Sequence, residues 1–115
     1  MKKALDPLWG AILDAVSFDV ASQTVTLDLR VPKGDQETTH TLVAHGVHEL
    51  RFTNTIPGPW TYAELTEIHA EALANDGLMI TAMIWSEESR LVIVADAITL
   101  NGVDLAASNT DKQEQ

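Results

Sequence analysis

The sequence contains four histidines, His40, His45, His48 and His69, which are its best candidates for binding a transition metal because it has no cysteine. His45 and His48 are three residues apart on either side of a glycine, so a turn could bring their imidazoles together. The spacing matches neither the His-Glu-x-x-His pattern of helical zinc sites nor the paired histidines of cupins. A metal site formed by His45, His48 and His69 is therefore an alternative hypothesis. We expect solvated surface histidines and no cofactor.

Three glutamates, Glu64, Glu67 and Glu71, are candidates for acid–base chemistry or for contact with a partner. On a helix they would lie on one side, whereas on a strand Glu67, His69 and Glu71 would share a face. Paired carboxylates act as general acid and base when burial separates their pKa values, but nothing in the neighbouring sequence indicates a buried cleft. The sequence also has no nucleophile elbow and no phosphate-binding glycine loop. We therefore expect a solvated acidic face on a protein that is not an enzyme.

The distribution of charge favours contact with a basic protein. The chain carries 17 Asp and Glu against 7 Lys and Arg, a formal net charge of −10, which disfavours binding to nucleic acid phosphates. Between Phe52 and Ser89 every formally charged side chain is acidic. A field of one sign accelerates association with an oppositely charged protein, although solubility alone would also account for it.

Two aromatic side chains, Trp60 and Tyr62, complete the candidate partner-binding set with the three glutamates. Pro57 and Pro59 restrict the chain just before them, and rigid aromatic loops often bind partners. The other interpretation is that Trp60 closes the end of the core. The remaining large aromatic residues, Trp9, Phe18, Phe52 and Trp85, are expected in the core.

Alternation of apolar and polar residues predicts several strands. The clearest is at residues 24–31, where four apolar side chains alternate with polar ones. Further strands are expected at residues 16–20, 39–44 and 48–54, with Gly46 at the bend between the last two. Before them, Asp6 and Pro7 are typical of a helix start and predict a short helix over about residues 7–15.

The last third of the chain predicts an antiparallel meander. Residues 78–85 and 91–100 are apolar on both faces, so we expect both faces to be covered. Residues 87–89 supply the turn between them, and Asn101-Gly102 predicts a type I′ hairpin turn into Val103. The predicted fold is mainly β, an antiparallel two-layer sheet resembling a β-sandwich, with a short N-terminal helix.

Residues 61–75 admit two interpretations. As a helix, Thr61 and Glu64 would form a capping box ahead of an apolar stripe. As a strand, alternate side chains would face opposite ways, and Asn75-Asp76-Gly77 would form a hairpin turn. The alternative fold is therefore α+β, with a helix at about residues 61–75.

A resemblance covers most of the chain. The segment Ile56-Pro-Gly-Pro-Trp-Thr-Tyr-Ala-Glu-Leu-Thr-Glu-Ile-His69, with the strands before and after it, resembles a group of small uncharacterised bacterial proteins. More distantly, the chain is similar to the YxiG-like proteins and to immunity proteins of polymorphic toxin systems. The resemblance implies a mainly antiparallel sheet, a strand rather than a helix over residues 65–73, and a protein that binds rather than catalyses. It carries over no active-site residues.

We expect one domain over residues 1–105 and a flexible polar tail over residues 106–115. No apolar stretch reaches the roughly 20 residues that cross a bilayer, and Asp6 and Pro7 interrupt the apolar segment that a secretion signal needs. A cytoplasmic location is therefore expected. The leading functional hypothesis is a non-catalytic protein-binding module, an inhibitor or immunity-type protein that docks a basic partner. A small-ligand or metal-binding domain is the alternative, and self-association through the strand near residues 103–105 would make the protein a homo-oligomer.

Reversing the charge of Glu64, Glu67 and Glu71 is expected to slow association with a basic partner. The effect should be larger at low than at high ionic strength, because salt screens exposed charges. Association rates measured at two salt concentrations test this, and an unchanged rate would remove the glutamates from the binding surface.

Overall fold

The structure, a computed structural model, describes residues 2–105. Residues 106–115, for which the sequence predicts a flexible tail, lie outside the described residues. In chain order the elements are α1 (Lys2–Leu5), η1 (Asp6–Leu8), β1 (Ala11–Asp19), β2 (Thr24–Lys33), β3 (Gln36–Asn54), β4 (Glu64–Ala72), β5 (Leu78–Ile84), β6 (Ser86–Leu100) and β7 (Val103–Asp104). Every strand pair is antiparallel, and the mainly β class predicted from the sequence is confirmed.

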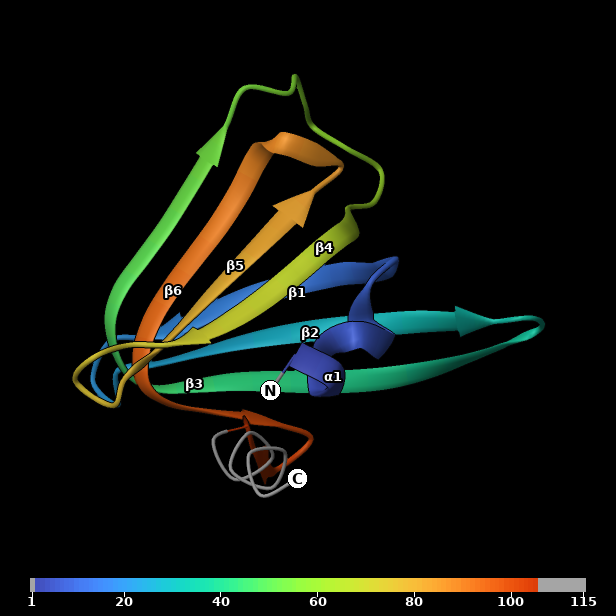
Figure 1. The fold of residues 1–115 in the computed structure, drawn as a ribbon. Helices are drawn as coiled ribbons and strands as arrows, with labels where there is room; N and C mark the ends of the chain where they lie inside the picture. Colours follow the sequence, from blue (N-terminus) through green and yellow to red (C-terminus); the bar gives the residue numbers. More distant parts are fainter. Residues whose placement is uncertain (1, 106–115) are drawn as a thin grey trace.

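The strands form one sheet that closes on itself. Their order is β3-β2-β1-β4-β5-β6-β7, and β3 also pairs with β6. Figure 1 shows the sheet folded into two arms: β1, β2 and the first half of β3 run along the lower arm, and β4, β5, β6 and the second half of β3 along the upper one. The two layers thus belong to a single folded sheet.

The strand β3 connects the arms because it bends at Gly46. The sequence predicts two strands separated by this glycine, whereas the structure has one strand, with a bulge between Val47 and Glu49. Gly46 has a φ of +64°, and a Cβ at this position would overlap the carboxylate of Asp96 on β6. The side chain of Asp96 therefore lies against the backbone where β3 turns from one arm into the other, and glycine avoids both this overlap and the strain of a left-handed φ.

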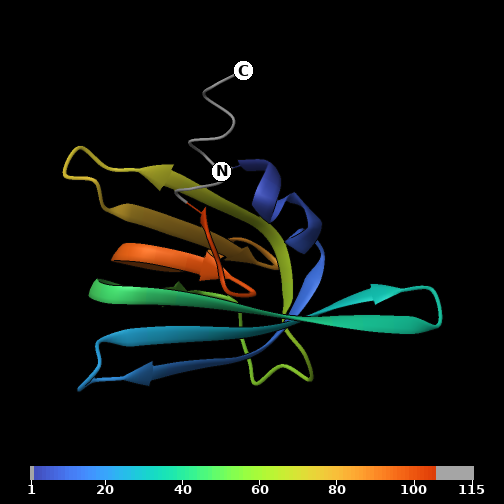
Figure 2. The ribbon, with the colours of Figure 1, turned by 90° about the horizontal axis from the view of Figure 1, so that it is seen from below.

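The core lies between the arms. Its largest fully buried side chains include Leu27 on β2, Leu42 on β3 and Ile93 on β6. Leu5 and Leu8 of the N-terminal turns are also fully buried. In Figure 2 these turns lie on the opposite side of the molecule from the loop that joins β3 to β4. The N-terminal turns therefore close one side of the space between the arms.

The helix predicted over about residues 7–15 is wrong. A short 3₁₀ turn ends at Leu8, Gly10 has a φ of +87°, and the strand β1 begins at Ala11. Asp6 and Pro7 do start a turn, but pairing with β2 satisfies the backbone beyond Gly10. Tertiary pairing thus overrides a local helix signal.

The α+β alternative, with a helix at about residues 61–75, is also wrong, because this segment contains the strand β4. Its buried side chains Leu65 and Ile68 lie opposite Ile84 and Ala82 of β5. The connecting turn has Asp76 at a φ of +68° and a hydrogen bond from the Gly77 N–H to the Asn75 side chain. The strand interpretation and the predicted turn are both confirmed.

The last hairpin is also confirmed. Asn101 and Gly102 both have positive φ, +53° and +84°, as a type I′ turn requires, and Val103 pairs with Leu100. The preceding turn differs from the prediction, because residues 87–89 belong to β6 and the chain reverses from Trp85, which has a φ of +71°.

The expectation that both faces of β5 and β6 are covered is wrong. Met79 and Met83 on β5 and Val92 and Val94 on β6 point away from the core and are partly exposed. No element of residues 2–105 packs over this outer face. The alternating burial along β5 shows that only one side meets the core.

Replacing Gly46 with alanine is expected to destabilise the fold through left-handed backbone strain of about 1–2 kcal/mol and through the overlap with Asp96. Gly34→Ala is the matched control, because Gly34 also has a positive φ, +59°, but no atom near the added Cβ. Chemical denaturation should show a larger loss for Gly46→Ala than for Gly34→Ala. The excess should shrink when Asp96→Ala is added, because this removes the carboxylate and leaves only the Asp96 Cβ near the new methyl group. An equal loss for both glycines would contradict the overlap with Asp96.

Candidate functional site

The side of the molecule opposite the N-terminal turns is bordered by strand edges, and one of them belongs to β1. Residues 12–19 of β1 pair with β2, but the pairing with β4 is limited to Ala11 and Ile12. A further hydrogen bond, from the Leu13 N–H to the Ala63 carbonyl at 2.9 Å, ends this seam. Beyond it, the second edge of β1 meets no strand in the described part of the chain. Residues 14–19 therefore form a free edge.

The other border is the C-terminal half of β3. The pairing of β3 with β2 ends at His45, and Val47 donates a last hydrogen bond to the Gln23 carbonyl at 2.9 Å. Residues 49–54 then pair with β6 alone among residues 2–105. An apolar groove of about 370 Å³ lies between this edge and β1. We call it the β1/β3 groove, and its main lining residues are Leu13, Val16, Leu50, Phe52, Trp60 and Leu91.

The groove is an uncovered part of the inner face of the sheet. Val16 lies opposite Leu27 on β2, and Phe52 lies opposite Leu91 on β6, so each shares its face with a buried neighbour. Yet Val16 is 41% exposed and Phe52 is 55% exposed, and Phe18, further along the same face of β1, is 49% exposed. The prediction that Phe18 and Phe52 are buried in the core is therefore wrong. They point inward, but no described element covers them.

Trp60 and Tyr62 form an aromatic cluster with Trp85. The ring centroid of Trp85 is 6.3 Å from that of Trp60 and 5.0 Å from that of Tyr62, both in edge-to-face contact. The Trp60 indole N–H donates to the Pro57 carbonyl at 2.9 Å, which fixes the ring against its own loop. Trp60 packs against the core, as one interpretation of the sequence predicts, and it also lines the β1/β3 groove.

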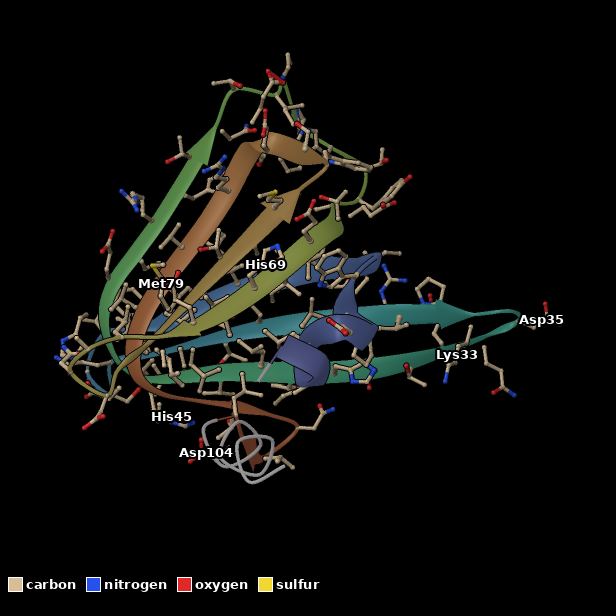
Figure 3. All side chains as sticks on the ribbon, viewed as in Figure 1. Lys33, Asp35, His45, His69, Met79 and Asp104 are labelled. Carbon is tan, nitrogen blue, oxygen red and sulfur yellow. The ribbon has the colours of Figure 1, made fainter. Side chains whose placement is uncertain are left out.

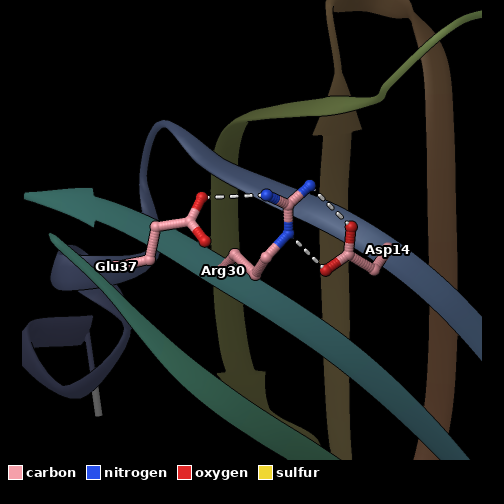
Figure 4. A network of polar contacts seen from close by, with 3 residues as sticks. All are labelled: Asp14, Arg30 and Glu37. Carbon is pink, nitrogen blue, oxygen red and sulfur yellow. Dashed lines mark hydrogen bonds and ion pairs between the residues drawn. The ribbon is translucent and has the colours of Figure 1, made fainter. Parts of the chain in front are cut away.

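A polar network holds β1 to its neighbours beside the groove, as Figure 4 shows. The Arg30 guanidinium on β2 donates two hydrogen bonds to Asp14 on β1, at 2.7 and 2.9 Å, and one to Glu37 on β3 at 2.9 Å. The hydrogen bonds from Arg30, together with its positive charge, lower the pKa of the Asp14 carboxyl. The network thus links three strands through one guanidinium, at the bulge where β1 leaves β4.

The glutamates of the candidate set do not line the groove. Glu64 starts β4, whereas Glu67 and Glu71 lie opposite Met83 and Met79 on the outer face of the upper arm. This face is turned away from the inner face that forms the groove. Arg90 on β6 pairs with Met83 in the same row, so a basic side chain joins the acidic surface that the sequence predicts.

The structure does not bring His45, His48 and His69 together. Each has its own nearest polar partner: His45 lies 3.4 Å from Thr99, His48 lies 2.7 Å from Asp96, and His69 lies 2.9 Å from Glu67. In Figure 3 His45 and His69 lie on different arms. Within residues 2–105 no group of three His, Asp or Glu side chains is arranged to hold a metal ion. The alternative metal site gains no support from these positions.

Two further aromatic residues are expected in the core. Trp85 is partly buried and packs against it, whereas Trp9 is 42% exposed. Its indole N–H donates to the Ile68 carbonyl at 3.0 Å, and its ring meets that of His69 edge-on at 5.3 Å. Trp9 therefore packs on the outer side of β4 rather than inside the sheet.

Comparisons with known proteins assign the chain to no family. No protein-family model matches the chain, and no curated protein matches it. No helix within residues 2–105 has the length and apolar character needed to cross a membrane.

Replacing Asp14 with asparagine is expected to lower stability near neutral pH and to have less effect in acid. Because the pKa of Asp14 is lowered in the folded state, its stabilising contribution is complete above the unfolded pKa of about 3.9 and is lost as pH falls through the folded pKa. The difference in melting temperature between wild type and Asp14→Asn should therefore be constant from pH 7 to 5 and shrink below pH 4. Asp35→Asn, at the tip of the β2–β3 hairpin, is the control, and a difference that grows in acid would contradict the assignment.

Proposed function

We propose that the protein is a non-catalytic, cytoplasmic protein-binding module, and that the β1/β3 groove holds an extended segment of a basic partner protein. The observation that carries the proposal is an open apolar groove between two strand edges, in a chain with a net charge of −10.

Exposed apolar surface at the groove favours binding. Val16, Phe18 and Phe52 are each more than two-fifths exposed although their neighbours on the same face are buried. Covering such surface yields about 25 cal/mol per Å², and contiguous exposed apolar patches usually mark interaction sites. The groove therefore has the composition of a site that another molecule completes.

The lining of the groove favours binding over catalysis. Among the described residues that line it, Asp14 is the one ionisable side chain, and Arg30 holds its carboxylate. General acid–base chemistry usually needs two groups with different pKa values, and orienting a small polar ligand needs convergent polar groups. An apolar segment of a protein needs neither.

The charge of the chain favours a basic partner. With 17 acidic against 7 basic side chains, the protein attracts cationic proteins from a distance and repels acidic ones. Glu67 and Glu71, on the outer face of β4, contribute to this field without lining the groove. An inhibitor or immunity-type protein works in this way, in line with the resemblance found in the sequence.

A displayed library of random peptides of about twelve residues, selected against the purified protein, tests the proposal. The selected peptides are expected to combine apolar residues with an excess of Lys and Arg. Phe52→Glu should weaken their binding about 10- to 100-fold, because a phenylalanine contributes about 1.5–3 kcal/mol when fully buried. Val103→Glu is the matched control, since Val103 is an exposed apolar residue on β7 that does not line the groove.

Two outcomes would overturn the proposal. One is that no enriched peptide binds the Phe52→Glu variant more weakly than the Val103→Glu variant. The other is Phe52-dependent binding of an apolar dye, anilinonaphthalene sulfonate, without peptide binding, which would indicate a site for small apolar ligands.

A further inference from the structure

We infer that the partner segment binds as an added β-strand on the free edge of β1, residues 14–19, with alternate side chains in the β1/β3 groove. This inference rests on the proposed function and specifies how the groove is filled.

The backbone of β1 provides the template. From residue 14 onward this strand pairs with β2 on one side, and no strand of residues 2–105 occupies its other side. Backbone N–H and C=O groups on such an edge can pair with another extended chain, and adding a strand is a recurrent mode of peptide recognition. Because residues 14–19 span about 20 Å when extended, they match a segment of about six residues.

The edge lacks the usual protection against pairing. Natural edges are often blocked by lysine, proline or an inward-pointing charge. Between Asp14 and Asp19 the edge reads Ala-Val-Ser-Phe, with no charged side chain and no proline. The bulge places Asp14 against Arg30 on β2, where its two hydrogen bonds hold the carboxylate. The four uncharged residues therefore remain open to a further strand.

The side chains next to this edge define which segment fits. Val16 and Phe18 both face inward and are partly exposed, so an added strand would place its own inward residues beside them, over the groove. Side chains two apart on a strand share a face, so the segment needs an alternating apolar pattern. Asp19 ends this edge and favours a segment with Lys or Arg at the end that lies beside it.

The charge of the chain disfavours a second copy as the occupant. Each copy carries a net charge of −10, and two molecules with the same net charge repel one another. A basic segment of another protein satisfies the same edge without this repulsion.

Backbone methylation of the tightest-binding selected peptide tests strand addition, since it leaves the protein unchanged. In an antiparallel strand pair, alternate residues direct their amides toward the neighbour. Methylation at one set of alternate amides should therefore weaken binding more than 10-fold, and methylation at the other set less than 2-fold. In the ¹⁵N-labelled protein, alternate amides of residues 14–19 should exchange more slowly with solvent when the peptide is bound, while those of the β2–β3 hairpin tip should not change.

The outcomes separate this inference from the proposed function. Peptides that depend on Phe52 but tolerate methylation at every position would overturn strand addition and leave groove binding intact. If no selected peptide depends on Phe52, both proposals fail. A dimer in sedimentation velocity that protects the amides of residues 14–19 without peptide would assign the edge to a second copy and overturn the inference.

Discussion

The fold depends on one strand, β3, that belongs to both arms of the sheet. Its first half pairs with β2 and its second half with β6, and residues 42–45 pair with both. The bend at Gly46 is possible because glycine adopts a φ of +64° and leaves room for Asp96 on β6. The bend turns a single sheet back over itself, so that Leu27 and Ile93, on different arms, enter one core.

Because of the same bend, the space between the arms is filled on one side of the molecule and open on the other. On one side Leu5 and Leu8 of the N-terminal turns fill the space between the arms. On the other side β1 leaves β4 after two paired residues, while the second half of β3 has already left β2. Inner-face side chains such as Val16 and Phe52 are therefore exposed although their partners across the strand pairs are buried. The β1/β3 groove therefore forms on the side where these strands separate.

The net charge of the protein influences which molecules the β1/β3 groove favours. An exposed apolar edge normally risks association with identical copies, but a net charge of −10 opposes that association. The network of Asp14, Arg30 and Glu37 also keeps β1 on its own sheet, since one guanidinium joins three strands. The groove thus combines an apolar surface with a field that favours cations, and the proposed preference for a basic partner rests on this combination.

The elements that could be predicted are those whose signals depend on near neighbours in the sequence. Alternation predicted β2, and the Asn101-Gly102 dipeptide predicted the last hairpin. For residues 61–75 the sequence left helix and strand open, and the Asn75-Asp76-Gly77 turn belonged to the strand interpretation. The candidate site was predicted only in part, because Trp60 lines the groove whereas Glu67 and Glu71 lie on the other face. That residues 11–15 form a strand, and that Phe18 and Phe52 are uncovered, depends on contacts between strands that are distant in the sequence. An inward-facing side chain is buried only where another strand meets it across the sheet, and no local pattern specifies that meeting.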